Sequence, residues 1–248
     1  MTATSAWFLR SEPRVRPRIR LFCFPHAGGG ASMFLGWRTG LPHDVETVPV
    51  QLPGLEARLL EPPFLEMPRL VEAVEQAISR YTATPFAFFG HSMGALVAFE
   101  VARFLRRHGG VTPELLVVSA CRAPHLSNAD PPVHHLSDAA LVEKLRTLGG
   151  TPEAILRSNE VMRVVLPRLR ADLQICATYA YEREPPLSCP ILALGGLDDT
   201  RVGRTDLAGW RVHTTGAFAL RLWAGNHFFL KSAEASVLKA VGEELIRT

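Results

Sequence analysis

One stretch of this chain decides its fold: Phe86-Ala87-Phe88-Phe89-Gly90-His91-Ser92-Met93-Gly94-Ala95-Leu96-Val97. An apolar run leads into a GxSxG motif, and apolar residues at helical spacing follow it. A strand-to-helix turn of this kind strains the backbone of the serine, and glycine two residues to either side leaves room for neighbouring chains. The context predicts Ser92 as a nucleophile. The alternative is a serine that only caps the following helix.

Short, nearly continuous apolar runs indicate further strands, each buried on both faces. They are Ile19–Phe24, Val45–Gln51, Leu115–Ala120, Ile191–Leu194 and Leu220–Ala224. Apolar residues at helical spacing, as over residues 70–78 and 96–105, separate most of the runs. This alternation predicts βαβ crossovers, and therefore an α/β fold with a mainly parallel central sheet flanked by helices.

The alternation breaks between Arg122 and Pro190. Residues 137–148 form one predicted helix, with Ser137 at its start and Gly149-Gly150 at its stop. A second helical stretch runs from Glu160 to about residue 181. We expect a single domain over residues 1–248, with residues 123–188 inserted as a helical lid. The alternative is a set of ordinary helices packed on the sheet.

One face of the second helical stretch is apolar: Met162, Val165, Leu166, Leu169, Leu173 and Cys176. Pro167 is expected to mark a helix start or a kink. If the segment is a lid, its apolar face should line an acyl channel as well as pack. Leu169 and Leu173 are therefore candidate substrate-binding residues.

A serine hydroxyl needs a base to become a nucleophile, and the base needs an orienting carboxylate. Gly225-Asn226-His227-Phe228-Phe229 follows the last predicted strand and places a histidine in a tight loop. His227 is therefore the candidate base. His213 precedes that strand, and His91 is expected to point away from the hydroxyl of Ser92, so both are poorer candidates.

The candidate acid lies at the end of another predicted strand. Two carboxylates occur in Gly195-Gly196-Leu197-Asp198-Asp199-Thr200-Arg201-Val202. Asp199 fits a G-x-x-D-x-x-V spacing counted from Gly196, whereas Asp198 is more simply a solvated turn residue. We therefore assign Asp199, and the order Ser, acid, His is the one that accompanies GxSxG turns.

Acyl transfer also requires donors aimed at the developing oxyanion. The first strand ends in Phe24-Pro25-His26-Ala27-Gly28-Gly29-Gly30, a flexible loop expected beside the GxSxG turn. We assign the backbone amides of Ala27 and Met93 as the donors. The glycines do not indicate a phosphate loop, because no Lys-Ser/Thr follows them and GxGxxG is absent.

Composition narrows the class of protein. Apolar residues make up 47% and charged residues 21% of the 248 residues, which is ordinary for a globular enzyme. No apolar run approaches the roughly 20 residues of a membrane span, and the N-terminus lacks the apolar stretch of a signal peptide. We expect a cytoplasmic protein without a membrane partner. The four cysteines lack paired zinc spacing, so no metal and no cofactor are expected.

The net charge of +3 is too weak for a nucleic-acid footprint. Arginines do cluster before the first strand: Arg10, Arg14, Arg16, Arg18 and Arg20. A mildly basic surface of this kind can still meet an acidic partner.

With these residues in hand, the sequence resembles the type II thioesterases that accompany polyketide synthases and non-ribosomal peptide synthetases, which have the α/β-hydrolase fold. More distantly it resembles the medium-chain thioesterase of fatty-acid synthesis. The matching stretches span nearly the whole chain: residues 21–29, Gln51-Leu52-Pro53-Gly54, residues 90–95, residues 148–152, Arg170-Ala171-Asp172 and His227-Phe228-Phe229-Leu230. Gly30, where serine is frequent, and Asn226, where a small residue is frequent, depart from the pattern.

The resemblance implies hydrolysis of stalled or aberrant acyl groups from the phosphopantetheine arm of an acyl or peptidyl carrier protein. It places Ser92, Asp199 and His227 on the catalytic triad and implies a mobile lid. The residues themselves do not select a thioester over an ester. A carboxylesterase or lipase, an acyltransferase and a non-catalytic carrier-binding module therefore stay open as alternatives.

Overall fold

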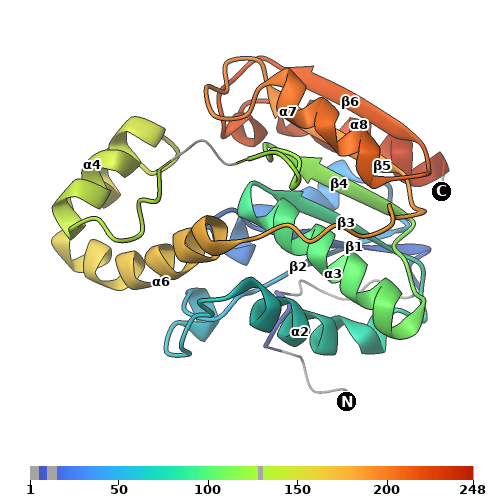
Figure 1. The fold of residues 1–248 in the computed structure, drawn as a ribbon, viewed down its shortest axis with the longest axis horizontal. Coiled ribbons are helices and arrows are strands. Elements are labelled where there is room, and N and C mark those ends of the chain that lie inside the picture. Colours follow the sequence, from blue (N-terminus) through green and yellow to red (C-terminus); the bar gives the residue numbers. More distant parts are fainter. Residues whose placement is uncertain (1–5, 10–15, 128–130, 248) are drawn as a thin grey trace.

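A six-stranded parallel sheet forms the centre of the molecule, in the order β2-β1-β3-β4-β5-β6 (Figure 1). The computed structural model describes residues 6–9, 16–127 and 131–247, so Arg10 and Arg14 lie outside the described residues. The strands are β1 (Ile19–Phe24), β2 (Val45–Pro49), β3 (Phe86–His91), β4 (Leu115–Ser119), β5 (Ile191–Gly196) and β6 (Phe218–Trp223). The predicted parallel sheet with flanking helices is confirmed.

Helices cover both faces of the sheet, and a further group stands beside it. The α-helices are α1 (Trp37–Gly40), α2 (Met67–Ile78), α3 (Met93–Gly109), α4 (Asp138–Leu148), α5 (Glu153–Leu156), α6 (Asn159–Thr178), α7 (Arg204–Ala208) and α8 (Glu234–Arg247). Side chains of α2, α3 and α7 pack on one face, and those of α1 and α8 pack on the other. Helices α4–α6, which we call the helical cover, stand to one side of this sandwich (Figure 1, left).

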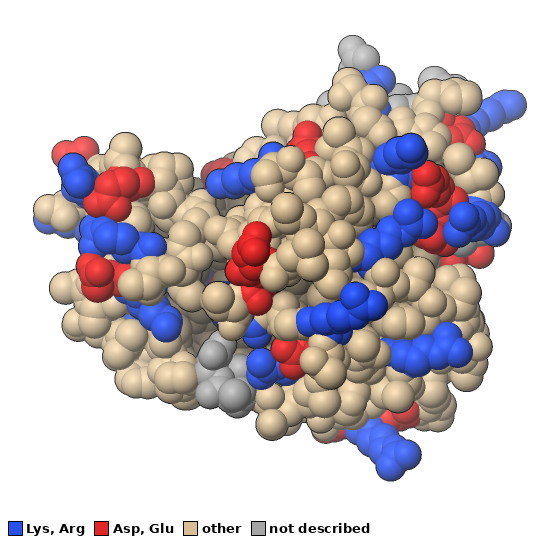
Figure 2. Space-filling view, turned by 90° about the horizontal axis from the view of Figure 1, so that it is seen from above, with Lys and Arg blue, Asp and Glu red and all other residues tan. Residues whose placement is uncertain are grey.

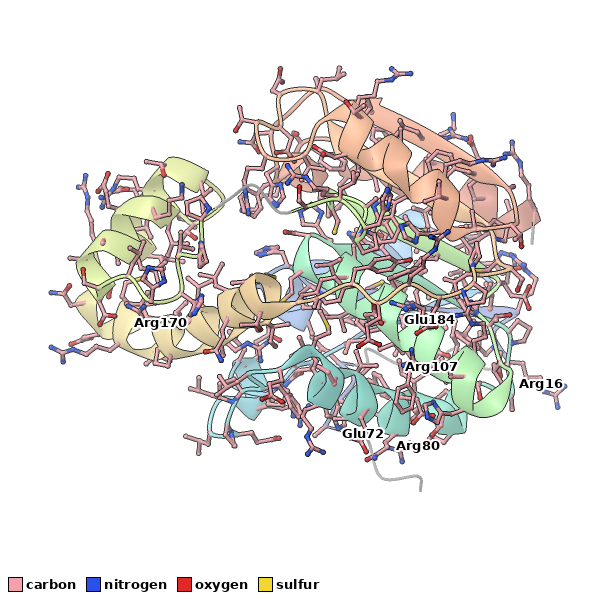
Figure 3. The ribbon with its side chains drawn as sticks, in the orientation of Figure 1. Arg16, Glu72, Arg80, Arg107, Arg170 and Glu184 are labelled. Atoms are coloured by element: carbon pink, nitrogen blue, oxygen red, sulfur yellow. The ribbon has the colours of Figure 1, made fainter. Side chains whose placement is uncertain are left out.

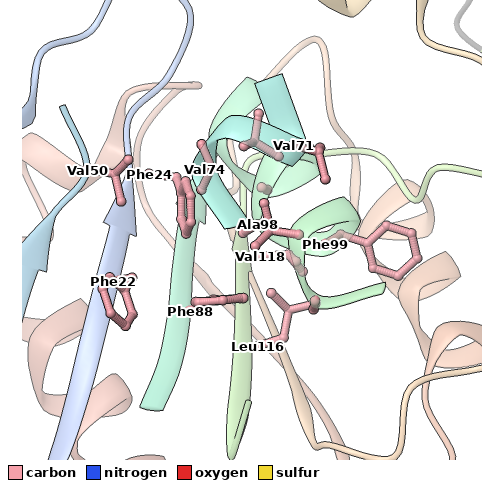
Figure 4. Close-up of a cluster of buried hydrophobic side chains, with 14 of the residues drawn as sticks. Phe22, Phe24, Val50, Val71, Val74, Phe88, Ala98, Phe99, Leu116 and Val118 are labelled. Carbon is pink, nitrogen blue, oxygen red and sulfur yellow. The ribbon is translucent and has the colours of Figure 1, made fainter. Parts of the chain in front are cut away.

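Alternate residues of each strand enter opposite cores. Phe22 and Phe88 pack beneath α2 and α3 (Figure 4), whereas Leu21 and Phe89 face α1 and α8. Burying a side chain of this size contributes about 1.5–3 kcal/mol, and the central strands do so on both faces. The near-continuous apolar runs of the sequence follow from this two-sided burial.

The topology places a crevice between β1 and β3. The chain passes from β1 outward to β2 and then returns to β3 on the other side of β1. The loops that follow β1 and β3 therefore leave the sheet in opposite directions. Ligands bind at such switch points in open α/β sheets, beyond the carboxyl ends of the strands. Ala27 follows β1 and Ser92 follows β3, so both lie at this crevice.

Three local expectations need correction. Strand β5 continues to Gly196, where a Cβ atom would lie 2.3 Å from the carbonyl oxygen of Gly225. Strand β6 begins at Phe218 and is only half-buried, so its apolar signal is weaker. Pro167 does not start α6, which runs through it from a start capped by the Ser158 hydroxyl. Pro167 lies inside the helix, where it removes one intrahelical hydrogen bond and its ring crowds the carbonyl of Arg163, which favours a kink.

Candidate active site

Ser92 stands on a sharp turn between β3 and α3. Its φ is +54°, and its N–H donates to the carbonyl oxygen of Ser119 at 2.8 Å. A Cβ atom at Gly90 would lie 2.2 Å from the carbonyl oxygen of Gly94, and one at Gly94 would lie 2.2 Å from that of Phe24. Both motif glycines are therefore required by close backbone approach, and the turn holds Ser92 at the sheet edge.

His227 reaches Ser92 from the loop after β6. Its Nε2 lies 3.0 Å from Ser92 Oγ, and its Nδ1 lies 2.8 Å from Asp199 Oδ2. Gly225, with φ of +125°, turns the chain back over the sheet. The side chain of Asn226, one of the two departures from the family pattern, accepts the Phe228 N–H at 2.9 Å and so closes this loop.

Asp199 is held by backbone as well as by His227. Its Oδ1 accepts the N–H groups of Arg201 at 2.9 Å and Val202 at 3.2 Å. Burial by itself raises the pKa of Asp199, but hydrogen bonds from His227 and the two amides outweigh it and leave the pKa below its ordinary value. The carboxylate is thus kept ionised and aimed at the imidazole.

Asp198 has a different task from its neighbour. Its exposed side chain accepts the N–H of Gly225 at 3.0 Å and thereby ties the end of β5 to the loop of His227. It is more than a solvated turn residue, but its hydrogen bond is made to the Gly225 N–H and not to the imidazole. Of the two carboxylates, Asp199 is the one bonded to His227.

The other candidate histidines have partners of their own. His91 Nδ1 lies 2.9 Å from Ser119 Oγ, and burial lowers the pKa of His91 well below its ordinary value. His213 Nε2 lies 2.7 Å from His125 Nδ1, and burial lowers the pKa of His213 to about 4. Burial thus favours the neutral form of both rings, and the partner of His91 is Ser119 and that of His213 is His125, not Ser92.

Each of the two residues assigned as oxyanion donors lines a cavity together with Ser92. Met93 is the first residue of α3, where backbone N–H groups lack intrahelical partners. Ala27 follows β1 and packs against the small apolar core of the helical cover. The positive end of the α3 dipole favours negative charge at this place.

Two cavities open from Ser92. One, of about 430 Å³, lies on the sheet side. The other, of about 90 Å³, lies under the helical cover and is lined by both Leu169 and Leu173. The wall of the sheet-side cavity includes residues that sequence reasoning did not identify: Leu96, Cys121, His125, Tyr179, Tyr181 and Val202. Leu96 lies in the first turn of α3 and the others lie in the loops after β4, α6 and β5, so no shared sequence signal marks them.

Gly30, the other departure from the family pattern, is explained by Glu56. A Cβ atom at Gly30 would lie 2.0 Å from Glu56 Oε1, and the same oxygen accepts the N–H of Ser32 at 3.1 Å. The Glu56 carboxylate therefore fills the space that a serine side chain would need.

Other kinds of site find little support among the described residues. In residues 6–9, 16–127 and 131–247, no group of three or more His, Cys, Asp or Glu side chains is placed to hold a metal ion. No helix in this part of the chain has the length and apolar character to cross a bilayer. On the face shown in Figure 2, basic and acidic side chains alternate over the cover and the sheet body.

Comparison with known proteins agrees with this geometry. The family model described as the thioesterase domain matches residues 19–245. The gramicidin S biosynthesis protein GrsT of Aneurinibacillus migulanus is 39% identical over 245 residues, which cover 99% of this chain and 96% of that protein.

Solved structures show the same likeness. RedJ, a thioesterase of the prodiginine pathway in Streptomyces coelicolor, is 43% identical with a TM-score of 0.86, over 96% of this chain and 92% of that one. The type II thioesterase BorB from the borrelidin biosynthetic cluster is 37% identical with a TM-score of 0.91, over 99% of this chain and 100% of that one. The chain therefore belongs to the thioesterase family, as its resemblance to type II thioesterases predicts, and is a thioester hydrolase with the α/β-hydrolase fold.

Proposed function

We propose that this thioesterase removes stalled or aberrant acyl groups from the phosphopantetheine arm of a carrier protein in polyketide or non-ribosomal peptide synthesis. The observation that carries the proposal is the chain of hydrogen bonds from Ser92 through His227 to Asp199, placed where two cavities meet. The biosynthetic pathways named for GrsT, RedJ and BorB support the same assignment. A cytoplasmic location remains part of this proposal.

In the proposed mechanism, His227 Nε2 accepts the proton of Ser92 as Oγ attacks the thioester carbonyl. Asp199 holds the imidazole in the required tautomer and stabilises its positive charge. The amides of Ala27 and Met93 stabilise the oxyanion. The pantetheine thiol departs with a proton from His227, and a water activated by the same ring then releases the carboxylic acid.

The two cavities suit the two halves of such a substrate. The cavity under the cover is lined chiefly by aliphatic side chains: Leu145, Leu148, Met162, Val165, Leu169 and Leu173. The sheet-side cavity also presents polar groups, among them His125, Tyr179 and Tyr181. We assign the acyl group to the former and the amide-rich pantetheine arm to the latter.

The helical cover would then act as the lid of a single domain. Its helices enclose their own apolar core, formed by Leu141, Leu145, Leu156, Met162, Leu166 and Leu169. A segment with a separate core can shift as a unit over the sheet edge. This supports the assignment of residues 123–188 as an inserted lid, of which residues 128–130 lie outside the described part.

The carrier surface should dock near the cavities and not at the arginines before β1. Among the described residues, Arg16 and Arg18 precede β1 and Arg20 is its second residue, so they belong to the amino end of this strand, whereas Ser92 lies at the carboxyl ends of the parallel strands. Arg18 and Arg20 also pair with Asp44 and Glu46, each at 2.7 Å. Arg201, which lines both cavities, is the better placed cation for an acidic partner.

The test is hydrolysis of one acyl group presented three ways: on a carrier protein, on N-acetylcysteamine, and as an oxygen ester. We expect kcat/KM to fall in that order. An oxygen ester cleaved as fast as the thioesters would favour a carboxylesterase. Recovery of the acyl group on an added thiol or alcohol, instead of as free acid, would favour an acyltransferase.

A further inference from the structure

A buried ion pair lies within the helical cover and takes no part in the mechanism above. Arg168 and Asp172 stand one turn apart on α6, and one guanidinium nitrogen lies 2.7 Å from Asp172 Oδ1. Their exposed fractions are 3% and 1%. Replacing such a pair by apolar residues is often neutral or stabilising, so stability alone does not account for it.

The carboxylate of Asp172 reaches out of the cover to the loop after β1. Its Oδ2 accepts the N–H of Gly28 at 2.8 Å. The N–H of Gly28 and the carbonyl of Ala27 belong to one planar peptide group, so this bond fixes the chain directly after Ala27. Gly28 has φ of +73°, which glycine adopts about as readily as negative φ, so the backbone alone does not fix this loop and the bond to Asp172 helps to select its conformation.

Arg168 holds the carboxylate in place from the other side. Its guanidinium also donates to the carbonyl oxygen of Pro53, in the loop after β2. The aliphatic part of the Arg168 side chain packs on Gly54, because a Cβ atom at Gly54 would lie only 3.2 Å from Arg168 Cδ. Burial raises the pKa of Asp172, while Arg168 and the Gly28 amide act in the opposite direction.

We propose that Asp172 is a positioning residue that sets the oxyanion hole, with Arg168 fixing its carboxylate. This inference rests on the proposed function, because it takes the Ala27 amide as an oxyanion donor. The acceptor for Gly28 belongs to α6, so the oxyanion hole is complete only when the helical cover is seated on the loop. Asp172 thus couples closure of the cover to the chemical step.

The test compares two variants that both lack the buried charge. In an Arg168→Met background, Asp172→Asn keeps an oxygen that can accept the Gly28 N–H, whereas Asp172→Leu has similar volume and no acceptor. A displaced donor weakens transition-state binding more than substrate binding. We expect kcat of the leucine variant to be about 10- to 100-fold below that of the asparagine variant. We expect their KM values to stay close, with similar thermal unfolding.

Arg170→Ala provides the matched control. Arg170 lies on the same helix (Figure 3), where its guanidinium pairs with Asp138 and donates to the His134 carbonyl, and neither contact involves Gly28. It should leave kcat nearly unchanged. Equal kcat in the asparagine and leucine variants, or a difference confined to KM, would overturn the inference.

A separate measurement distinguishes this failure from failure of the proposed function. Ser92→Ala must abolish thioester hydrolysis if the proposed mechanism holds. If the two Asp172 variants have the same kcat and Ser92→Ala is inactive, only the positioning role is rejected. An active Ser92→Ala would reject the mechanism on which that role depends.

Discussion

The catalytic edge and the helical cover are held in place by different means. At the edge, formed by the ends of β3 and β5 and the loop after β6, backbone hydrogen bonds fix Ser92 and Asp199. The cover has its own small core, and it meets the rest of the molecule through apolar packing, such as Ile175 in the main core, and through polar contacts. The polar contacts include Asp172 to Gly28 and Lys231 Nζ to the Gly150 carbonyl at 3.1 Å. Changes at the edge should therefore alter chemistry, and changes at the cavity-lining face of the cover should alter selection. Asp172 is the exception, because it links the cover to the proposed oxyanion hole.

The largest effect should come from Ser92→Ala. We expect thioester hydrolysis to fall by roughly 10⁴-fold or more with the fold intact, because alanine fits the strained turn but offers no nucleophile. His227→Ala should be comparably inactive, since the hydroxyl then has no base. Single-turnover kinetics and circular dichroism check both.

His213→Ala is the control for the histidine. His213 pairs with His125, a lining residue of the sheet-side cavity, and should not be needed for chemistry. An inactive His213→Ala with a folded chain and an active His227→Ala would move the base away from the catalytic edge.

The next effect separates two neighbouring carboxylates. Asp199→Asn should lower kcat by roughly 10³- to 10⁴-fold, because an amide at this position favours the wrong imidazole tautomer. Asp198→Asn should stay near wild type, since the asparagine oxygen can still accept the Gly225 N–H. Steady-state kinetics of the two variants give the ranking. The reverse ranking would make Asp198 the acid.

The same contrast explains what could be predicted from the sequence. The strands and the Ser92, Asp199 and His227 candidates occur in short contiguous motifs whose spacing is set by local backbone geometry. The sheet-side cavity could not be predicted, because Leu96, Tyr179 and Val202 come from three separate segments. The tie between Asp172 and Gly28 joins residues 144 positions apart, and no local pattern contains it.

A smaller effect should mark the cover as the acyl side. Leu173 is half-buried and lines the cavity under the cover. We expect Leu173→Trp to lower kcat/KM for long acyl chains about tenfold more than for short ones, because the indole shortens the channel. A panel of acyl-N-acetylcysteamine thioesters measures this.

Two variants sharpen the assignment of the cavities. Leu169 is 5% exposed and packs on Gly28, so Leu169→Trp should reduce activity at every chain length and lower stability. Leu96→Trp, in the sheet-side cavity, should slow pantetheine substrates without changing the length preference. If Leu96→Trp altered the length preference and Leu173→Trp did not, the acyl group would have to be assigned to the sheet-side cavity and the pantetheine arm to the cavity under the cover.

The smallest effect concerns the proposed carrier protein, which we expect to bind at the surface of the enzyme. Carrier proteins of this kind are usually acidic and this chain has a net charge of +3, so complementary charge should raise the encounter rate more than the final affinity. Raising ionic strength from about 0.01 M to about 0.15 M shortens the Debye length from about 30 Å to about 8 Å. The kcat/KM advantage of the carrier over N-acetylcysteamine should then narrow by about fivefold, while the small-thiol rate barely moves. Equal efficiency of both substrates at low salt would leave an enzyme that acts on free small thioesters.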